Sequence, residues 1–200
     1  PVIKGYLTHR GYLATNDSLQ LFGGSGFVEE WGMSQFVRDC RISTIYEGTN
    51  GIQALDLVGR KLMADSGRGW QTYFAEIDQL IADLDGKEEL QIFVDGLRDT
   101  KAKLADATQW MGANAMANFD NAGAGSFDYL CLFGLTSLAH MWLLMARSAV
   151  EKQSDSDPFY SNKLVTGRYF VERILPEADA HLAKLKTGAD SMMALEAAAF

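Results

Sequence analysis

The chain has 200 residues, of which 48% are hydrophobic and 22% charged, a balance typical of a globular protein with a sizeable core. With 18 Lys and Arg against 26 Asp and Glu, the net charge of -8 argues against nucleic acid or an anionic membrane as the main partner. No stretch reaches about 18 uncharged apolar residues, so we expect no membrane span. Two cysteines, Cys40 and Cys131, without a CxxC pair or a His/Cys cluster, suit a reducing compartment and predict no metal site.

Apolar residues recur three and four positions apart along the chain without the alternation of strands, so the predicted fold class is all-α. In the first third we expect a helix over 2–22 that stops at Gly23-Gly24, and a short helix over 31–38. A third helix is expected to run to about Met63, capped by Thr49 or Asn50.

Residues 65–69 form a linker by composition, and the remainder reads as an antiparallel helical bundle. Its expected helices cover residues 70–84, 88–118, 127–151, 159–173 and 183–199. The glycines of 122–125 are expected to separate the second of these from the third, which is apolar enough to be buried on more than one side. Residues 1–65 and 70–200 are therefore predicted to be two units.

The sequence from Gln20 to Gln53 contains the features that point to chemistry. A helix that runs into Gly-Gly-x-Gly leaves backbone open to a ligand, although such glycines more commonly just end a helix. Glu47 stands just before a helix, beside the apolar residues Ile45 and Tyr46, where lost solvation would make its carboxylate a stronger base. A glutamate there can also be a plain surface residue, and Arg38 with Asp39 suits a solvated ion-pair network that includes Arg41.

In combination, these segments resemble the acyl-CoA dehydrogenase family. Its members carry Gln-x-x-Gly-Gly-x-Gly-Tyr, then Arg-Asp, then Ile-Tyr-Glu-Gly-Thr-x-x-Ile-Gln. The matching positions are Gln20, Gly23, Gly24, Gly26, Arg38, Asp39, Ile45, Tyr46, Glu47, Gly48, Thr49, Ile52 and Gln53. Phe27 replaces the family's Tyr, which keeps the ring and loses a hydroxyl.

The resemblance extends beyond the usual end of these enzymes. The segments 167–176 and 189–193 are similar to the extra helical domain of the long members, above all those acting on 3-methylmercaptopropionyl-CoA. The resemblance implies that residues 1–65 are the end of the catalytic domain's C-terminal helical bundle and that residues 70–200 are the appended domain.

The resemblance also implies a catalytic role for Glu47. In the family this glutamate removes the α-proton of an acyl-CoA thioester while a β-hydride passes to N5 of FAD. The backbone N–H of the same residue, with a flavin ribityl hydroxyl, stabilises the thioester oxygen. Gly48 would line the path of the substrate.

Six further residues are implied to bind FAD. Gln20, Gly23 and Gly24 match positions that touch the FAD of a neighbouring subunit. Thr49, Asn50 and Gly51 match positions beside the FAD at the start of the next helix.

The resemblance implies three partners: acyl-CoA, an electron-transfer flavoprotein and further copies of the chain in a dimer or tetramer. It also implies a location in the cytoplasm of a bacterium. An acyl-CoA oxidase is an alternative. Because the domains that hold most of the flavin are not in this sequence, we expect a C-terminal fragment that binds FAD weakly and is inactive alone. A second hypothesis is a non-catalytic helical oligomerisation or interaction module that retains a relic of the motif.

Overall fold

The computed structural model describes residues 1–115, 117–154 and 157–199. Within these ranges the chain forms helices and no strand, and Ser154 and Asp157 make only an isolated bridge. This confirms the all-α prediction. The α-helices are α1 (Val2–Leu21), α2 (Gly24–Phe27), α3 (Met33–Ile42), α4 (Asn50–Asp56), α5 (Arg68–Leu84), α6 (Gln91–Asn114), α7 (Phe119–Lys152), α8 (Pro158–Tyr169) and α9 (Glu177–Lys186).

Short helices of other types join these elements. π-Helical turns at Leu57–Lys61 and Phe170–Ile174 continue α4 and α8. With these turns, the two helical stretches end close to their predicted ends, at about Met63 and at residue 173. The 3-10 turns are Glu29–Trp31, Ala64–Gly67, Glu88–Leu90 and Ala197–Ala199.

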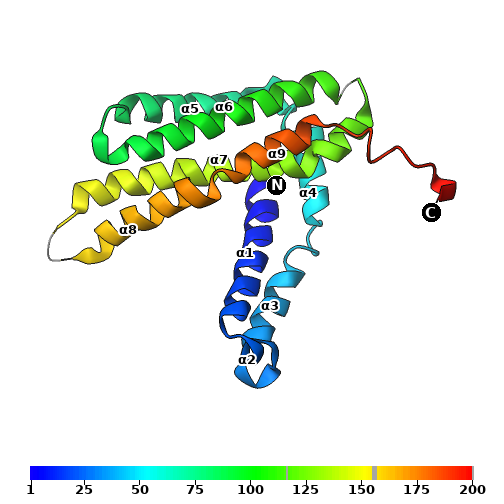
Figure 1. Cartoon of the computed structure of the whole chain (residues 1–200). Coiled ribbons are helices and arrows are strands. Elements are labelled where there is room, and N and C mark those ends of the chain that lie inside the picture. The colour runs from blue at the N-terminus through cyan, green and yellow to red at the C-terminus, as the bar shows by residue number, and fades with distance from the viewer. Residues whose placement is uncertain (116, 155–156, 200) are drawn as a thin grey trace.

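Helix α7 lies at the centre of the molecule. It contacts α1, α4, α6, α8 and α9, and it buries leucines on several sides, as predicted for 127–151. Leu130, Leu132, Leu135 and Leu143 are fully buried, and each contributes about 1.5–3 kcal/mol by leaving water. Figure 1 shows α5, α6, α8 and α9 running alongside α7, while α1 crosses the bundle at a steep angle.

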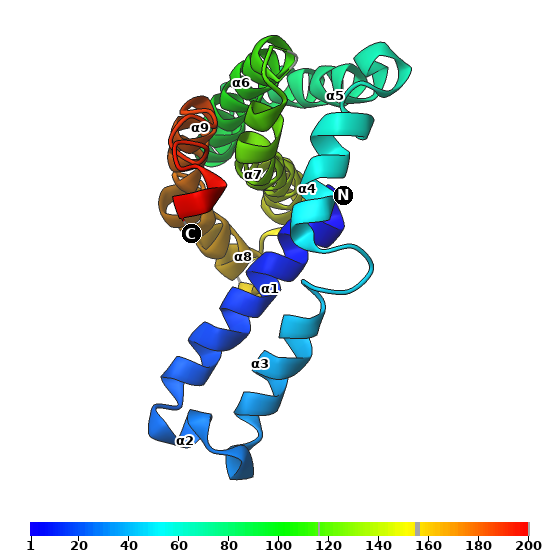
Figure 2. The same cartoon turned by 90° about the vertical axis from the view of Figure 1, so that its right-hand side faces the viewer.

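Helices α1, α2 and α3 form a hairpin that projects from this bundle (Figure 2). Only the start of α1 belongs to the core, where Tyr6 is 2% exposed. From Leu21 onward the hairpin exposes large apolar side chains, among them Phe27, Trp31 and Phe36. The core itself is continuous, because Ala54, Leu57 and Leu62 of the first third join the same buried cluster as the bundle.

Helix α7 also corrects two expectations. It begins at Phe119, so the glycines of 122–125 lie inside it, and the preceding helix ends earlier, at Asn114. Asn118 caps α7 by accepting a hydrogen bond from the Asp120 N–H at 3.0 Å. A Cβ on Gly125 would lie 3.3 Å from both Leu185 and Met111, so this glycine serves close packing between helices rather than a break.

The same helix is long and apolar enough, by length and composition, to cross a membrane, which corrects the expectation that no such stretch exists. Its most apolar window is 61% buried by the rest of the chain. Central helices of helical bundles pass the same test, and the packing of α7 places it in that class.

The prediction of a last helix over residues 183–199 is also wrong. Helix α9 covers Glu177–Lys186, directly after Pro176, which separates it from the preceding helical turn as predicted. Gly188 then adopts a positive φ of 68°, and the Asn121 side chain accepts a hydrogen bond from the Ala189 N–H at 2.9 Å. The left-handed Gly188 and this remote contact follow the end of α9, and the next segment extends away from the bundle (Figure 1).

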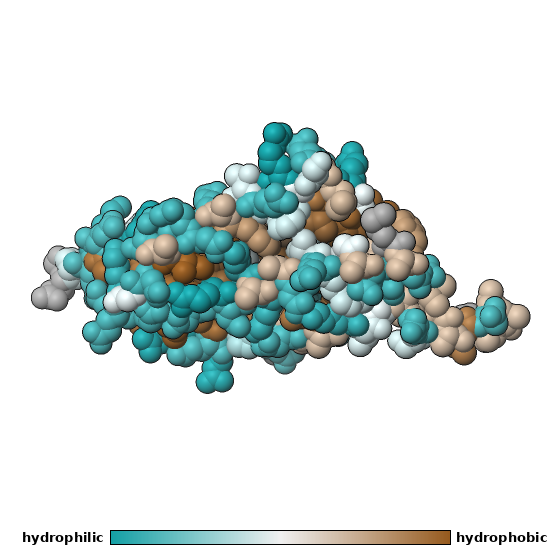
Figure 3. Space-filling view, turned by 90° about the horizontal axis from the view of Figure 1, so that it is seen from above, coloured by the Kyte–Doolittle hydropathy of each residue, from teal (hydrophilic) through white to brown (hydrophobic). Residues whose placement is uncertain are grey.

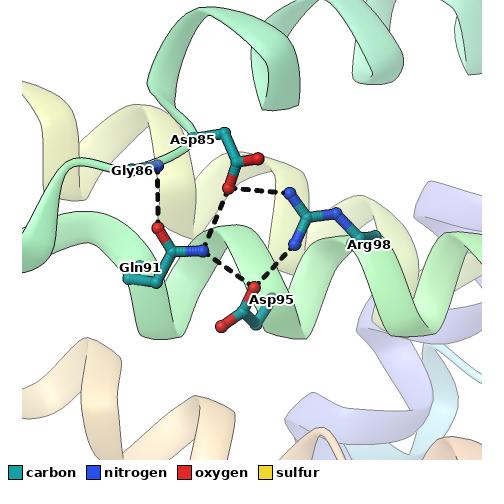
Figure 4. A network of polar contacts seen from close by, with 5 residues as sticks. All are labelled: Asp85, Gly86, Gln91, Asp95 and Arg98. Atoms are coloured by element: carbon teal, nitrogen blue, oxygen red, sulfur yellow. Dashed lines mark hydrogen bonds and ion pairs between the residues drawn. The ribbon is translucent and has the colours of Figure 1, made fainter.

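Polar networks join the bundle helices at their surface. Figure 4 shows one at the α5–α6 turn, where Arg98 contacts Asp85 at 2.8 Å and Asp95 at 2.7 Å. The Gln91 side chain donates to both carboxylates and accepts from the Gly86 N–H. Hydrogen bonds from Gln91 and Arg98 therefore lower the pKa of Asp85.

Asp128 on α7 gives a pH-dependent contribution to stability. Its Oδ1 accepts from His181 Nδ1 at 2.7 Å and from Lys184 Nζ at 2.9 Å. Burial raises the pKa of this carboxyl, but the two hydrogen bonds outweigh burial and bring the pKa below its ordinary value. A lowered folded-state pKa stabilises the fold above the unfolded value, and that stabilisation disappears as pH falls through the folded value.

We therefore expect Asp128→Asn to lower the free energy of unfolding by about 1–2 kcal/mol at pH 7. The difference from the unsubstituted chain should shrink as pH falls below the ordinary carboxyl value. Urea unfolding at pH 7, 4 and 3 measures this, with the exposed Asp17→Asn as the matched control. A difference that is constant with pH would contradict the assignment to the charge of Asp128.

Candidate functional site

The structure places the predicted site residues in two groups at opposite ends of the hairpin. Gln20, Gly23 and Gly24 lie at its tip, where α1 ends and α2 begins. The residues from Glu47 to Gly51 lie at its base, next to Lys4 near the start of α1. From Lys4 to Gln20 the helix rises about 24 Å, so the two groups are far apart along α1 (Figure 2).

The tip presents open backbone. Gln20 is exposed, and a Cβ built on Gly23 or Gly24 would find no atom within 4 Å. Gly23 has a φ of 58°, which favours glycine. Gly26 has a different role, because a Cβ there would collide with the Leu19 carbonyl.

The base of the hairpin is a tight connection between α3 and α4. Glu47 has a φ of 54° and Gly48 a φ of 80°, so two successive residues are left-handed. For a glutamate this conformation costs about 1–2 kcal/mol. Such strain persists only where the surrounding contacts impose it, and it is commonest at functional sites. The Glu47 side chain is exposed.

Two side chains hold the carbonyls of these residues, and a third bonds the neighbouring Asn50. Lys4 Nζ donates to the Gly48 carbonyl at 2.7 Å and to Asn50 Oδ1 at 2.9 Å. Thr8, one turn further along α1, donates to the same Asn50 oxygen at 3.2 Å. Gln53 Nε2 donates to the Glu47 carbonyl at 3.2 Å.

Sequence reasoning found Gln53 as part of the motif but missed Lys4 and Thr8. The available signal was their spacing of one helical turn, which puts two polar groups on one face of the helix. Nothing in the sequence tells which loop that face meets.

The other residues of this loop differ in what they offer a ligand. Thr49 caps α4, as predicted, by accepting from the Ile52 N–H at 3.3 Å. Asn50 is only 7% exposed, so its side-chain oxygen is used inside the fold. Gly51 is exposed at the first turn of α4. Among the hydrogen bonds of the described residues, none uses the N–H of Glu47.

Exposed apolar residues flank Glu47 in the sequence of this connection. Ile45, Tyr46 and Ile52 are 49%, 52% and 55% exposed, which is high for residues of this size. An apolar molecule that covers them would remove water from around Glu47 and strengthen it as a base. The arrangement can therefore accept a proton from a bound apolar compound.

The expected ion-pair network is absent from the contacts of the described residues. Asp39 accepts a hydrogen bond from Gln35 at 2.7 Å instead. Arg41 bonds the Thr44 hydroxyl and lies 5.6 Å from the centroid of the Tyr12 ring. Arg38 is exposed and forms no ion pair with the other described residues. Local geometry explains this, because α3 directs Arg41 toward α1.

The described residues contain no group of three or more His, Cys, Asp or Glu placed to hold a metal ion. The residues of the tip and the base do fit a flavin nucleotide. Open glycine backbone at Gly23 and Gly24 allows close approach, and Gln20 and Thr49 are exposed polar residues beside the two loops.

Two family models match the chain. Residues 1–63 match "Acyl-CoA dehydrogenase, C-terminal domain" and residues 73–196 match "Acetyl-CoA dehydrogenase C-terminal like".

Curated proteins match across both parts. A 3-methylmercaptopropionyl-CoA dehydrogenase from Ruegeria pomeroyi is 34% identical over 96% of this chain and 33% of its own length. The broad-specificity linear acyl-CoA dehydrogenase FadE5 from Mycobacterium tuberculosis is 29% identical over 100% of this chain and 34% of its own. A butyryl-CoA dehydrogenase from Syntrophomonas wolfei is 26% identical over the same shares.

The chain thus spans about a third of the length of these curated relatives. The matches cover the loops of the candidate site as well as the bundle. With a family model over more than half of its residues, the chain belongs to the acyl-CoA dehydrogenase family.

Proposed function

We propose that this chain supplies the catalytic base and part of the FAD site of an acyl-CoA dehydrogenase that introduces an α,β double bond into an acyl-CoA thioester. The observation that carries the proposal is the conformation of Glu47. Its exposed carboxylate stands on a strained, left-handed loop that Lys4 and Gln53 hold in place, within the motif shared with the family.

In this proposal the Glu47 carboxylate takes the α-proton of the thioester. The N–H of the same residue bonds no other described residue and can donate to the thioester oxygen as negative charge develops there. Gly48 would line the path of the acyl chain; its φ of 80° favours glycine, and a Cβ there would lie 3.0 Å from Gln53 Nε2. Tyr46 and Ile45 exclude water from one side of the bound substrate.

Bound FAD would supply the acceptor for the β-hydride. Thr49, Asn50 and Gly51 would lie beside the FAD of the same subunit, with the Asn50 side chain acting mainly to hold the loop. Gln20, Gly23 and Gly24 would touch the FAD of a neighbouring subunit. The length of α1 between the two groups, about 24 Å, supports this division between two FAD molecules. It requires a homo-oligomer, and we propose a dimer or tetramer.

We further propose a cytoplasmic enzyme that passes its electrons to an electron-transfer flavoprotein. A helical oligomerisation module without catalysis is the second candidate function. The observation that favours it is the set of exposed apolar side chains along the hairpin, such as Phe27 and Phe36, which are 78% and 60% exposed.

A pair of measurements tests the proposal. The chain itself is titrated with FAD and run on gel filtration, and we expect a folded helical protein with weak flavin binding and no turnover. In parallel, a chimera joins the preceding two thirds of the Ruegeria relative to this chain. We expect the chimera to be yellow and to oxidise 3-methylmercaptopropionyl-CoA with an electron-transfer flavoprotein.

A folded chimera that takes up no FAD would contradict the proposal. A defined oligomer of this chain, combined with a chimera that lacks activity, would favour the second candidate. Tight stoichiometric FAD binding by the chain alone would contradict only the expectation that it needs a preceding part.

A further inference from the structure

An apolar cavity of about 620 Å³ lies between the two parts of the chain that match different family models. One wall comes from α1 and from the turn after α4, and the other from α5 and α7. Small-molecule sites have volumes of about 300–1,000 Å³ and are common between domains. The space-filling view in Figure 3 shows hydrophobic patches among largely hydrophilic side chains on the face seen from above.

The cavity has a buried floor and an exposed rim. Tyr6, Leu57 and Leu62 on the floor are 2%, 6% and 6% exposed, so the inner wall is well packed. At the rim Ile3 and Met141 are 77% and 44% exposed. An opening of this kind admits a molecule from solvent.

The polar groups of one wall are already satisfied. Ser137 Oγ donates to the Phe133 carbonyl at 2.9 Å, and the Tyr73 hydroxyl lies 3.2 Å from His140 Nδ1. The Tyr73 and Phe133 rings stack at 5.8 Å between centroids. This wall therefore offers apolar contact, not hydrogen bonds, to an occupant.

The charge at this cavity is positive. Lys61 is exposed and lines the cavity, and no acidic residue does so. Its ammonium forms no hydrogen bond or ion pair with the other described residues. Lys61 acts on the carboxylate of Asp56 only through space, and that carboxylate bonds Arg60 at 2.6 Å.

We infer that this cavity binds an aliphatic carboxylate, with its tail in the apolar space and its carboxylate at Lys61. The leucines and aromatic rings of the lining select a hydrocarbon chain, and the unpaired ammonium selects an anionic head. The site is separate from the Glu47 loop, because Lys61 lies eleven residues beyond Asn50 along nearly continuous helix, a rise of about 16 Å.

The test uses the chain as it is and titrates it with decanoate, decanol and decyltrimethylammonium, read out by fluorescence of the tryptophans, of which Trp70 lines the cavity. We expect decanoate to bind most tightly. Lys61→Gln should weaken decanoate binding about fivefold and leave decanol binding unchanged. Lys87→Gln, at the far end of α5, removes the same charge and should change neither.

Two variants test the location independently. Leu7→Trp and Met141→Trp add bulk at the rim from different helices, and each should weaken decanoate and decanol binding about tenfold. Circular dichroism checks that they fold, and one folded variant suffices for the test. Gel filtration with and without decanoate separates ligand binding from self-association.

The inference is overturned if decanoate does not bind, or if Lys61→Gln leaves its affinity unchanged. Unchanged binding in a folded rim variant would place the ligand elsewhere and also overturn it. A dimer that Met141→Trp dissociates, with no decanoate binding, would assign the surface to a second copy of the chain instead.

Discussion

Glu47→Gln in the chimera is expected to lower turnover by about 10²–10⁴-fold, the usual contribution of a general base. Glutamine keeps the size of the side chain and cannot accept the α-proton. Because Lys4 and Gln53 hold the loop through the Gly48 and Glu47 carbonyls, the substitution should leave the loop and the flavin spectrum unchanged. Stopped-flow reduction of the flavin by substrate measures the effect.

Glu151→Gln provides the matched control for this experiment. Glu151 is exposed near the end of α7 and should tolerate the same change with full activity. If Glu47→Gln retains turnover within a few-fold, another residue is the base. If the variant loses its flavin, the effect on turnover cannot be assigned to proton transfer, and Glu47 would instead help to form the cofactor site.

Gly134→Ala is expected to destabilise the fold by about 3 kcal/mol, at the upper end for an overpacked core. A Cβ on Gly134 would lie 2.8 Å from the Tyr6 Cβ and closer still to its ring atoms Cγ and Cδ1. Tyr6 is fully buried, and atoms so near its backbone cannot move unless α1 moves away from α7. Urea unfolding measures the loss.

Gly123→Ala on the same helix makes the matched control. A Cβ there would meet no atom within 4 Å, so alanine should stabilise α7 by about 1 kcal/mol through its higher helix propensity. Opposite signs for the two variants would confirm that packing against Tyr6, and not glycine content, sets the stability of α7. A loss below about 1 kcal/mol for Gly134→Ala would show that α1 adjusts its position easily.

The helices were predictable wherever local chemistry decides them. Apolar spacing gave the extent of α1 and α5, and the hydroxyl of Thr49 gave the start of α4. The errors fall where a distant residue decides. Gly125 packs closely against Leu185 within α7, and Asn121 bonds the backbone that follows α9.

In the candidate site, too, local sequence predicts some features, while distant residues determine others. The motif identifies Glu47 and its neighbours by residue type and spacing, but not the left-handed backbone that presents the carboxylate. The Gly48 carbonyl accepts from Lys4, more than forty positions away in the sequence, and the Glu47 carbonyl accepts from Gln53. Nor does the spacing show that Asn50 is buried and used within the fold.

The way α1 is held has a mechanical consequence. Its first turns are fixed in the bundle core by Tyr6, while its far end carries the glycines of the tip, about 24 Å beyond Lys4. A rigid rod clamped at one end magnifies any small tilt at the clamp into a larger displacement at the free end. Substitutions around Tyr6 and Gly134 would thus change the direction in which the tip points without touching the tip itself.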